Sequence, residues 1–85
     1  MDQNTTVGGT GVTLHERVAA NLRAEMAAQR KSTLDLAREL HVGHRAATRR
    51  WNGEQPIGLN ELSVIAKWLD VPVSALMAAR ERLAA

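Results

Sequence analysis

Apolar positions recur at helical spacing along most of the chain, and the breaks between these stretches predict five helices. The first starts behind Thr13, which forms a T-x-x-E capping box with Glu16 that satisfies the free amides of a helix start. Its apolar positions recur every fourth residue, at Val18, Leu22 and Met26. We expect this helix to end between Gln29 and Lys31.

Two shorter helical patterns follow, separated by a break at residues 41–43. Ser32 is a good N-cap for a helix from Thr33 to Leu40. The next helix, residues 43–52, opens at Gly43 and must stop at Gly53, because glycine readily adopts the left-handed conformation that ends helices. Two helices joined by a short turn are the arrangement of helix-turn-helix proteins, which place the second helix in the DNA major groove.

The last two predicted helices lie on either side of a second break, at residues 70–72. Gly58 to Leu69 has a clean apolar stripe and an acid, Glu61, in its first turn. Pro72 suits the first position of a helix that we expect to run to about Leu83. The expected apolar face of this last helix comprises Val73, Leu76, Met77 and Leu83.

Composition supports an all-α fold and limits the chemistry. Hydrophobic residues make up 45% of the 85 residues, but Trp51 and Trp68 are the only aromatic ones, which favours a helical bundle over a sheet. Residues 1–12 are glycine-rich without periodicity, and we expect a disordered arm there, with the domain at 13–85. The chain has no cysteine, signal peptide or long apolar run, so we expect a cytoplasmic protein without a membrane segment.

Charge is concentrated on the predicted helix-turn-helix. Residues 30–50 hold six bases and two acids, a local charge of +4, whereas the rest of the chain totals −2. A phosphate-binding surface requires this distribution. No nucleophile–base pair, carboxylate dyad or phosphate-binding glycine loop is present, so we expect neither an enzyme nor a cofactor. His41 and His44 have no third ligand at a suitable spacing, so no metal site is expected.

The order and spacing of several short motifs resemble the phage-repressor and Cro-type (XRE-type, lambda-repressor-like) helix-turn-helix family over roughly residues 13 to 78. These motifs are Ser32 with Leu36-Ala37, Leu40-x-Val42, the run Arg49 to Glu54 with Pro56, Leu59-x-Glu61-Leu62-x-x-Ile65-Ala66-x-x-Leu69-x-Val71, and Pro72-x-Ser74-x-Leu76. The resemblance implies a five-helix lambda-repressor-like bundle in which the second and third helices bind double-stranded operator DNA. It also implies a two-fold dimer, although a monomer on an asymmetric site stays open. The distal end of the apolar face of the last helix, around Met77 to Leu83, is the expected contact with a second subunit.

The sequence departs from this family at the turn and on the inner face of the third helix. His41 stands where the family usually has glycine, and histidine tolerates positive φ better than most residues. Ala47 and Arg50 replace residues that are often apolar, which leaves a thin inner face that Trp51 would have to fill.

A helical wheel at about 100° per residue divides residues 43–52 into two faces. Ala46, Ala47 and Trp51 fall on the inner side, whereas Arg45, Thr48, Arg49 and Asn52 fall on the outer side. Arginine suits guanine, asparagine suits adenine, and threonine suits either a thymine methyl group or a hydrogen-bonding base edge. We therefore expect the outer side to contact base edges. The alternative is an ordinary solvated polar face.

The predicted DNA contacts extend from this outer face to both helix starts. Arg50 lies at the inner edge, where it has two alternatives: a phosphate, or an ion pair with an acid such as Asp35 or Glu54. Arg23, Lys31 and Arg38 are either further phosphate contacts or plain surface bases. The complete predicted DNA-binding set is Ser32, Thr33, Gly43, His44, Arg45, Thr48, Arg49, Arg50 and Asn52.

These observations predict a sequence-specific DNA-binding transcriptional regulator, such as a phage repressor or Cro-like protein, that reads the major groove with residues 43–52. The alternative is a protein-interaction module such as an antitoxin or anti-regulator. The local charge of +4 favours DNA, because an interaction module does not need it.

Overall fold

The computed structural model describes residues 12–79, which contain five helices joined by short loops. In chain order they are α1 (Leu14–Ala28), α2 (Thr33–Leu40), α3 (His44–Asn52), α4 (Leu59–Leu69) and α5 (Val73–Met77). No strand occurs within residues 12–79, so the expected all-α class and the number of helices are confirmed there. The predicted arm lies outside the described residues except for Val12.

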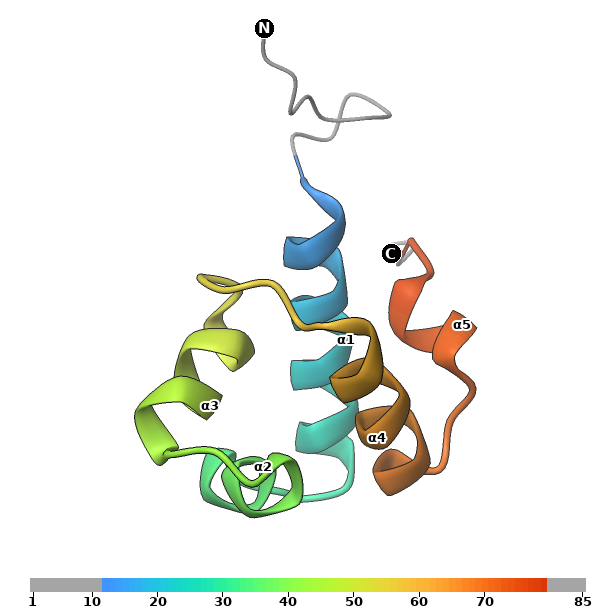
Figure 1. The fold of residues 1–85 in the computed structure, drawn as a ribbon. Coiled ribbons are helices and arrows are strands. Elements are labelled where there is room, and N and C mark those ends of the chain that lie inside the picture. Colours follow the sequence, from blue (N-terminus) through green and yellow to red (C-terminus); the bar gives the residue numbers. More distant parts are fainter. Residues whose placement is uncertain (1–11, 80–85) are drawn as a thin grey trace, which may run out of the picture.

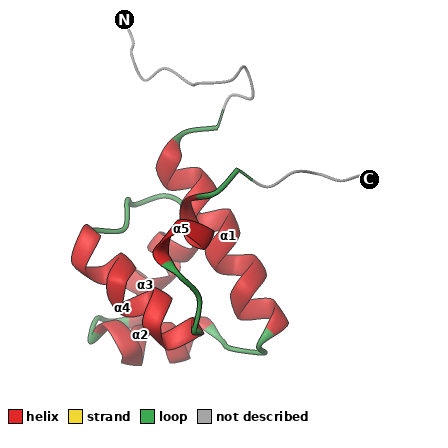
Figure 2. Cartoon of the chain, turned by 90° about the vertical axis from the view of Figure 1, so that its right-hand side faces the viewer, coloured by secondary structure: helices red, strands yellow, loops and turns green. Residues whose placement is uncertain are grey.

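Helix α1 is the central element of the bundle. Figure 1 shows α3 on one side of α1, α4 and α5 on the other, and α2 across the far end. Extensive contacts join α1 to α3 and to α5, and α2 to α3 and to α4. The view turned by 90° in Figure 2 places α5 directly over α1. The helix-turn-helix pair α2–α3 therefore rests on α1 and α4.

The apolar stripes that predict the helices also form the core. The largest apolar side chains that are at most 1% exposed are Leu22, Met26, Leu36, Ile65, Leu69 and Leu76. Burial of each such side chain stabilises the fold by roughly 1.5 to 3 kcal/mol. Trp51 and Trp68 are half-buried and pack against this core. The packing of Trp51 agrees with the expectation that its ring fills space on the inner face of the third helix.

Local capping explains where the first helices begin. Thr13 Oγ1 accepts a hydrogen bond from the Glu16 amide at 3.3 Å, and the Glu16 carboxylate accepts one from the Thr13 amide at 3.1 Å. The predicted capping box is thus confirmed. The bounds of α2 and α3 also agree with the sequence prediction, whereas α1 ends at Ala28, slightly before the predicted end between Gln29 and Lys31.

Helix α5 is shorter than its sequence pattern predicts. It ends at Met77, and Ala78 is extended (φ −70°, ψ 146°), so the prediction of a helix to about Leu83 is wrong. The buried Asn21 amide donates hydrogen bonds to the carbonyl oxygens of Leu76 at 2.7 Å and Ala78 at 2.9 Å. These bonds satisfy carbonyl groups at the end of α5, so the chain can leave the helix there.

Only part of the expected apolar face of α5 is buried. Leu76 is fully buried, but Val73 is 38% and Met77 is 37% exposed. Leu83 lies outside the described residues. The inward packing of this helix therefore depends mainly on Leu76.

Candidate nucleic-acid interface

The start of α2 is held by reciprocal hydrogen bonds between Ser32 and Asp35. Ser32 Oγ accepts from the Asp35 amide at 3.1 Å, and Asp35 Oδ2 accepts from the Ser32 amide at 2.8 Å. These bonds from Ser32, with a smaller contribution from Arg38, lower the pKa of the Asp35 carboxyl below its usual range. The predicted N-cap is confirmed, and its hydroxyl keeps an O–H donor for an external contact.

The turn between α2 and α3 is made without glycine at its left-handed position. His41 adopts φ 57° and ψ 44° at the C-cap of α2, where the family pattern usually has glycine. Gly43 then serves as the N-cap of α3 with extended backbone. This turn brings the first residues of both helices together, and Thr33 Oγ1 lies 2.8 Å from His44 Nε2. Two predicted DNA contacts thus bind each other directly.

The outer side of α3 carries exposed polar side chains. Arg45, Arg49 and Asn52 are exposed, and Asn52 Nδ2 donates to Glu54 Oε2 at 3.3 Å. Thr48 is half-buried, and its hydroxyl donates to the carbonyl oxygen of His44 at 2.9 Å. That bond leaves the Thr48 methyl group and oxygen lone pairs for an external contact. The predicted division of the helix into two faces agrees with this exposure.

The inner side of α3 consists of small side chains and one large ring. Ala47 is fully buried, Ala46 is half-buried, and Trp51 packs against the core. From α1, the Arg23 guanidinium lies 5.7 Å from the Trp51 ring centroid and donates to the Trp51 carbonyl oxygen at 2.8 Å. Arg23 therefore holds the C-terminal end of α3, a structural role that the sequence pattern did not distinguish from a phosphate contact.

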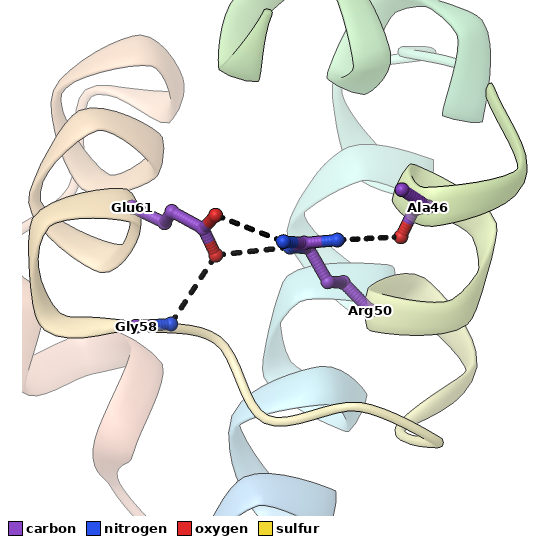
Figure 3. Close-up of polar contacts among 4 residues, drawn as sticks. All are labelled: Ala46, Arg50, Gly58 and Glu61. Carbon is purple, nitrogen blue, oxygen red and sulfur yellow. Dashed lines mark hydrogen bonds and ion pairs between the residues drawn. The ribbon is translucent and has the colours of Figure 1, made fainter. Parts of the chain in front are cut away.

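Arg50 forms an ion pair with Glu61 of α4. Its Nε donates to Glu61 Oε1 at 2.9 Å and its Nη2 donates to Oε2 at 3.0 Å, a two-pronged contact shown in Figure 3. Of the two alternatives, the ion pair with an acid is therefore the one that the structure shows. The acids named from the sequence, Asp35 and Glu54, are not the partners, and that part of the expectation is wrong. The Arg50 side chain is only 11% exposed, so it does not belong to the outer face of α3 with Arg45 and Arg49.

Glu61 is fixed from two sides. It accepts hydrogen bonds from the Arg50 guanidinium and from the Gly58 amide, the latter at 3.2 Å. Chiefly because of the Arg50 hydrogen bonds, the pKa of the Glu61 carboxyl is lowered, although partial burial opposes this shift. The sequence indicated Glu61 only as a helix-start residue, and its distance from Arg50 along the chain concealed the pair.

Comparison with known proteins identifies the family. A model of the BetR domain matches residues 11–84, almost the whole chain. The chain belongs to the BetR domain family. This family match supports a helix-turn-helix regulator domain, a broader class than the phage-repressor and Cro-type family that the motifs resemble.

A solved structure also shares the fold of this BetR domain. The crystal structure of the clp gene regulator ClgR from C. glutamicum superimposes with a TM-score of 0.67 at 21% sequence identity, covering 74% of this chain and 82% of that chain. No curated protein gives a significant match. The similarity to ClgR supports the five-helix arrangement of the BetR domain.

The described part of the BetR domain offers neither a metal site nor a membrane span. Within residues 12–79, no three His, Cys, Asp or Glu residues lie close enough to hold a metal ion. None of the helices described there is long and apolar enough to cross a membrane.

Proposed function

We propose that this BetR domain belongs to a sequence-specific transcriptional regulator that binds double-stranded operator DNA through α2 and α3. The family match and the shared fold support the coarser part, a DNA-binding regulator. Action as a repressor, in the manner of phage-repressor and Cro-like proteins, is the finer part of the proposal. It is supported by the motif resemblance, and we place the protein in the cytoplasm of a bacterium or a phage-infected host.

The outer face of α3 is the observation that carries this proposal. It presents two arginines and an asparagine, Arg45, Arg49 and Asn52, all exposed on one helix that is held against α1 and α2. Charged and amide side chains on a rigid exposed helix suit the edges of base pairs in the major groove. We assign Arg45 and Arg49 to guanine and Asn52 to adenine, with the Thr48 methyl group toward thymine.

The starts of α2 and α3 supply the proposed phosphate contacts. Ser32, Thr33, Gly43 and His44 lie at these two helix starts, which the 2.8 Å contact between Thr33 and His44 joins. Free backbone amides and the positive end of the helix dipole favour a phosphate at such a position. Contacts of this kind fix the register of the protein on DNA, while α3 supplies the sequence preference.

We also propose a homodimer that uses α5. Val73 and Met77 are partly exposed on this helix, and Met77 lines an apolar groove with Leu14 and Leu59, which are 54% and 83% exposed. Exposed apolar side chains that gather in one place are typical of protein contacts. Sedimentation of the protein at increasing concentration tests this part, and a mass of one chain at all concentrations would contradict it.

The test of DNA binding is selection from a random duplex pool followed by a salt series. The wild-type protein should enrich a defined motif, and its affinity should fall steeply with salt, because phosphate contacts release counterions. A footprint on the enriched duplex would give the length and symmetry of the site. Failure to enrich any sequence, or binding that does not change with salt, would favour the alternative of a protein-interaction module.

A further inference from the structure

Arg50 is the one arginine of α3 whose guanidinium is turned into the protein within the described residues. Besides its two hydrogen bonds to Glu61, it donates from Nη1 to the carbonyl oxygen of Ala46 at 2.9 Å, one turn earlier in α3 (Figure 3). The Arg50 side chain is 11% exposed and that of Glu61 is 28% exposed. The guanidinium is therefore bonded to the backbone of its own helix and to a carboxylate of another.

This contact joins two helices that share little packing. In the described part of the chain, α3 packs extensively against α1 and α2, but α4 is not among its extensive neighbours. Glu61 is itself immobilised at the start of α4, because it accepts from the Gly58 amide and is followed by the buried Leu62. The ion pair thus adds a directional attachment between α3 and α4 to the apolar core that the two helices share.

The direction of this attachment determines where the outer arginines point. Adjacent residues of an α-helix differ by about 100° around the axis, so a fixed inward direction for Arg50 also fixes the outward direction of Arg49. Paired hydrogen bonds between a guanidinium and a carboxylate are directional, whereas apolar contacts permit rotation and sliding. The contact therefore restricts rotation of α3 about its own axis.

We propose that Arg50 is a positioning residue that acts through Glu61 to orient the base-contacting face of α3. This inference rests on the proposed DNA-binding function and deepens it. A partly buried ion pair is poor evidence of a large contribution to stability, because desolvation offsets much of the attraction. The role of the Arg50–Glu61 pair is to keep α3 in a defined orientation. In this proposal Arg50 itself does not contact DNA.

Glu61→Gln provides the decisive test because electrostatics and positioning predict opposite results. Removal of a carboxylate makes the net charge of the protein more positive. Electrostatic attraction to the DNA phosphates alone therefore predicts equal or tighter binding. Positioning predicts weaker binding to the preferred sequence. Glu39→Gln is the matched control, since it removes the same charge from α2 and leaves the ion pair intact.

The probes are the duplex enriched by the wild-type protein from a random pool and a scrambled duplex of equal length. Glu61→Gln and Arg50→Met should each lower the affinity ratio of enriched to scrambled duplex on the order of 10- to 100-fold, the effect of about one lost base contact. The double variant should lose no more than either single variant, because both changes remove one shared contact. Glu39→Gln should preserve the ratio.

Results other than these would contradict either the positioning role of Arg50 or the proposed DNA-binding function. A wild-type ratio in Glu61→Gln overturns the positioning role and leaves the proposed function in place. If Arg50→Met weakens both duplexes equally and makes the salt dependence shallower, Arg50 contacts phosphate instead. A wild-type protein that enriches no sequence defeats the proposed function, and the positioning role with it. Circular dichroism at the assay temperature shows which variants are folded, and Glu61→Gln, the milder change, carries the test if Arg50→Met is unfolded.

Discussion

The two sides of α3 use the same kind of residue for opposite purposes. On the outer side Arg45 and Arg49 are exposed, whereas on the inner side Arg50 is held by Glu61 and by the backbone of its own helix. A sum of charges along residues 30–50 counts all three alike. The comparison teaches that position around the helix axis, more than the number of bases, determines which arginine is available to DNA.

Substitutions on the inner side of α3 should reduce the free energy of unfolding far more than substitutions on its outer side. Trp51→Ala removes a ring that packs against the core and lies under the Arg23 guanidinium, so we expect a loss of about 3 kcal/mol in the free energy of unfolding. Urea unfolding followed by circular dichroism measures this change. Arg49→Ala, on the outer side, is the control and should change stability by about 0.5 kcal/mol or less. Equal losses in both variants would contradict the division into faces.

Binding should show the reverse dependence. Arg49→Ala or Arg45→Ala should each weaken binding to the enriched duplex by about 1 to 3 kcal/mol and relax the preference at one base pair. Competition binding against single-base variants of the duplex measures both effects. Lys31→Ala, at the end of the α1–α2 connection, should instead weaken all duplexes alike. If both arginine variants also weakened every duplex equally, base contacts by the outer face would be excluded.

Low pH should remove the contribution of the Arg50–Glu61 pair on the inner side of α3 to the free energy of unfolding. The pKa of Glu61 is lowered in the folded protein, so its pair with Arg50 stabilises the fold fully above the ordinary carboxyl pKa. This contribution, about 1 kcal/mol for a partly exposed pair, is lost as pH falls through the lowered pKa of Glu61. Urea unfolding of wild type and Glu61→Gln should therefore differ at pH 7 and converge in acid. A difference that does not change with pH would assign the effect to something other than the charge.

Features set by neighbouring residues could be predicted from the sequence. The bounds of α2 and α3 follow from Ser32, Gly43 and Gly53, which act within one turn of the helix that they begin or end. The outer face of α3 likewise follows from helical periodicity alone. These parts of the fold and of the candidate site needed no information about distant contacts.

Features set by distant residues could not be predicted. The end of α5 depends on the amide of Asn21, which is 55 residues away from Leu76 in the chain. The partner of Arg50 lies 11 residues away, across a loop, and helical spacing gives no information about how α4 approaches α3. Both cases involve a polar side chain that reaches another helix, and no periodic pattern indicates such a bond.

The left-handed residues at helix ends leave this protein room to become more heat-resistant. Arg30, His41 and Asp70 all have φ near +60°, a conformation that costs a residue with a side chain roughly 1 kcal/mol more than glycine. His41→Gly should relieve this cost and raise the melting temperature by a few degrees. A lower melting temperature would show that the contacts of the His41 ring stabilise the fold by more than its left-handed backbone conformation costs. A relative adapted to hotter surroundings could gain stability at these three positions without altering the face of α3 that is proposed to contact DNA.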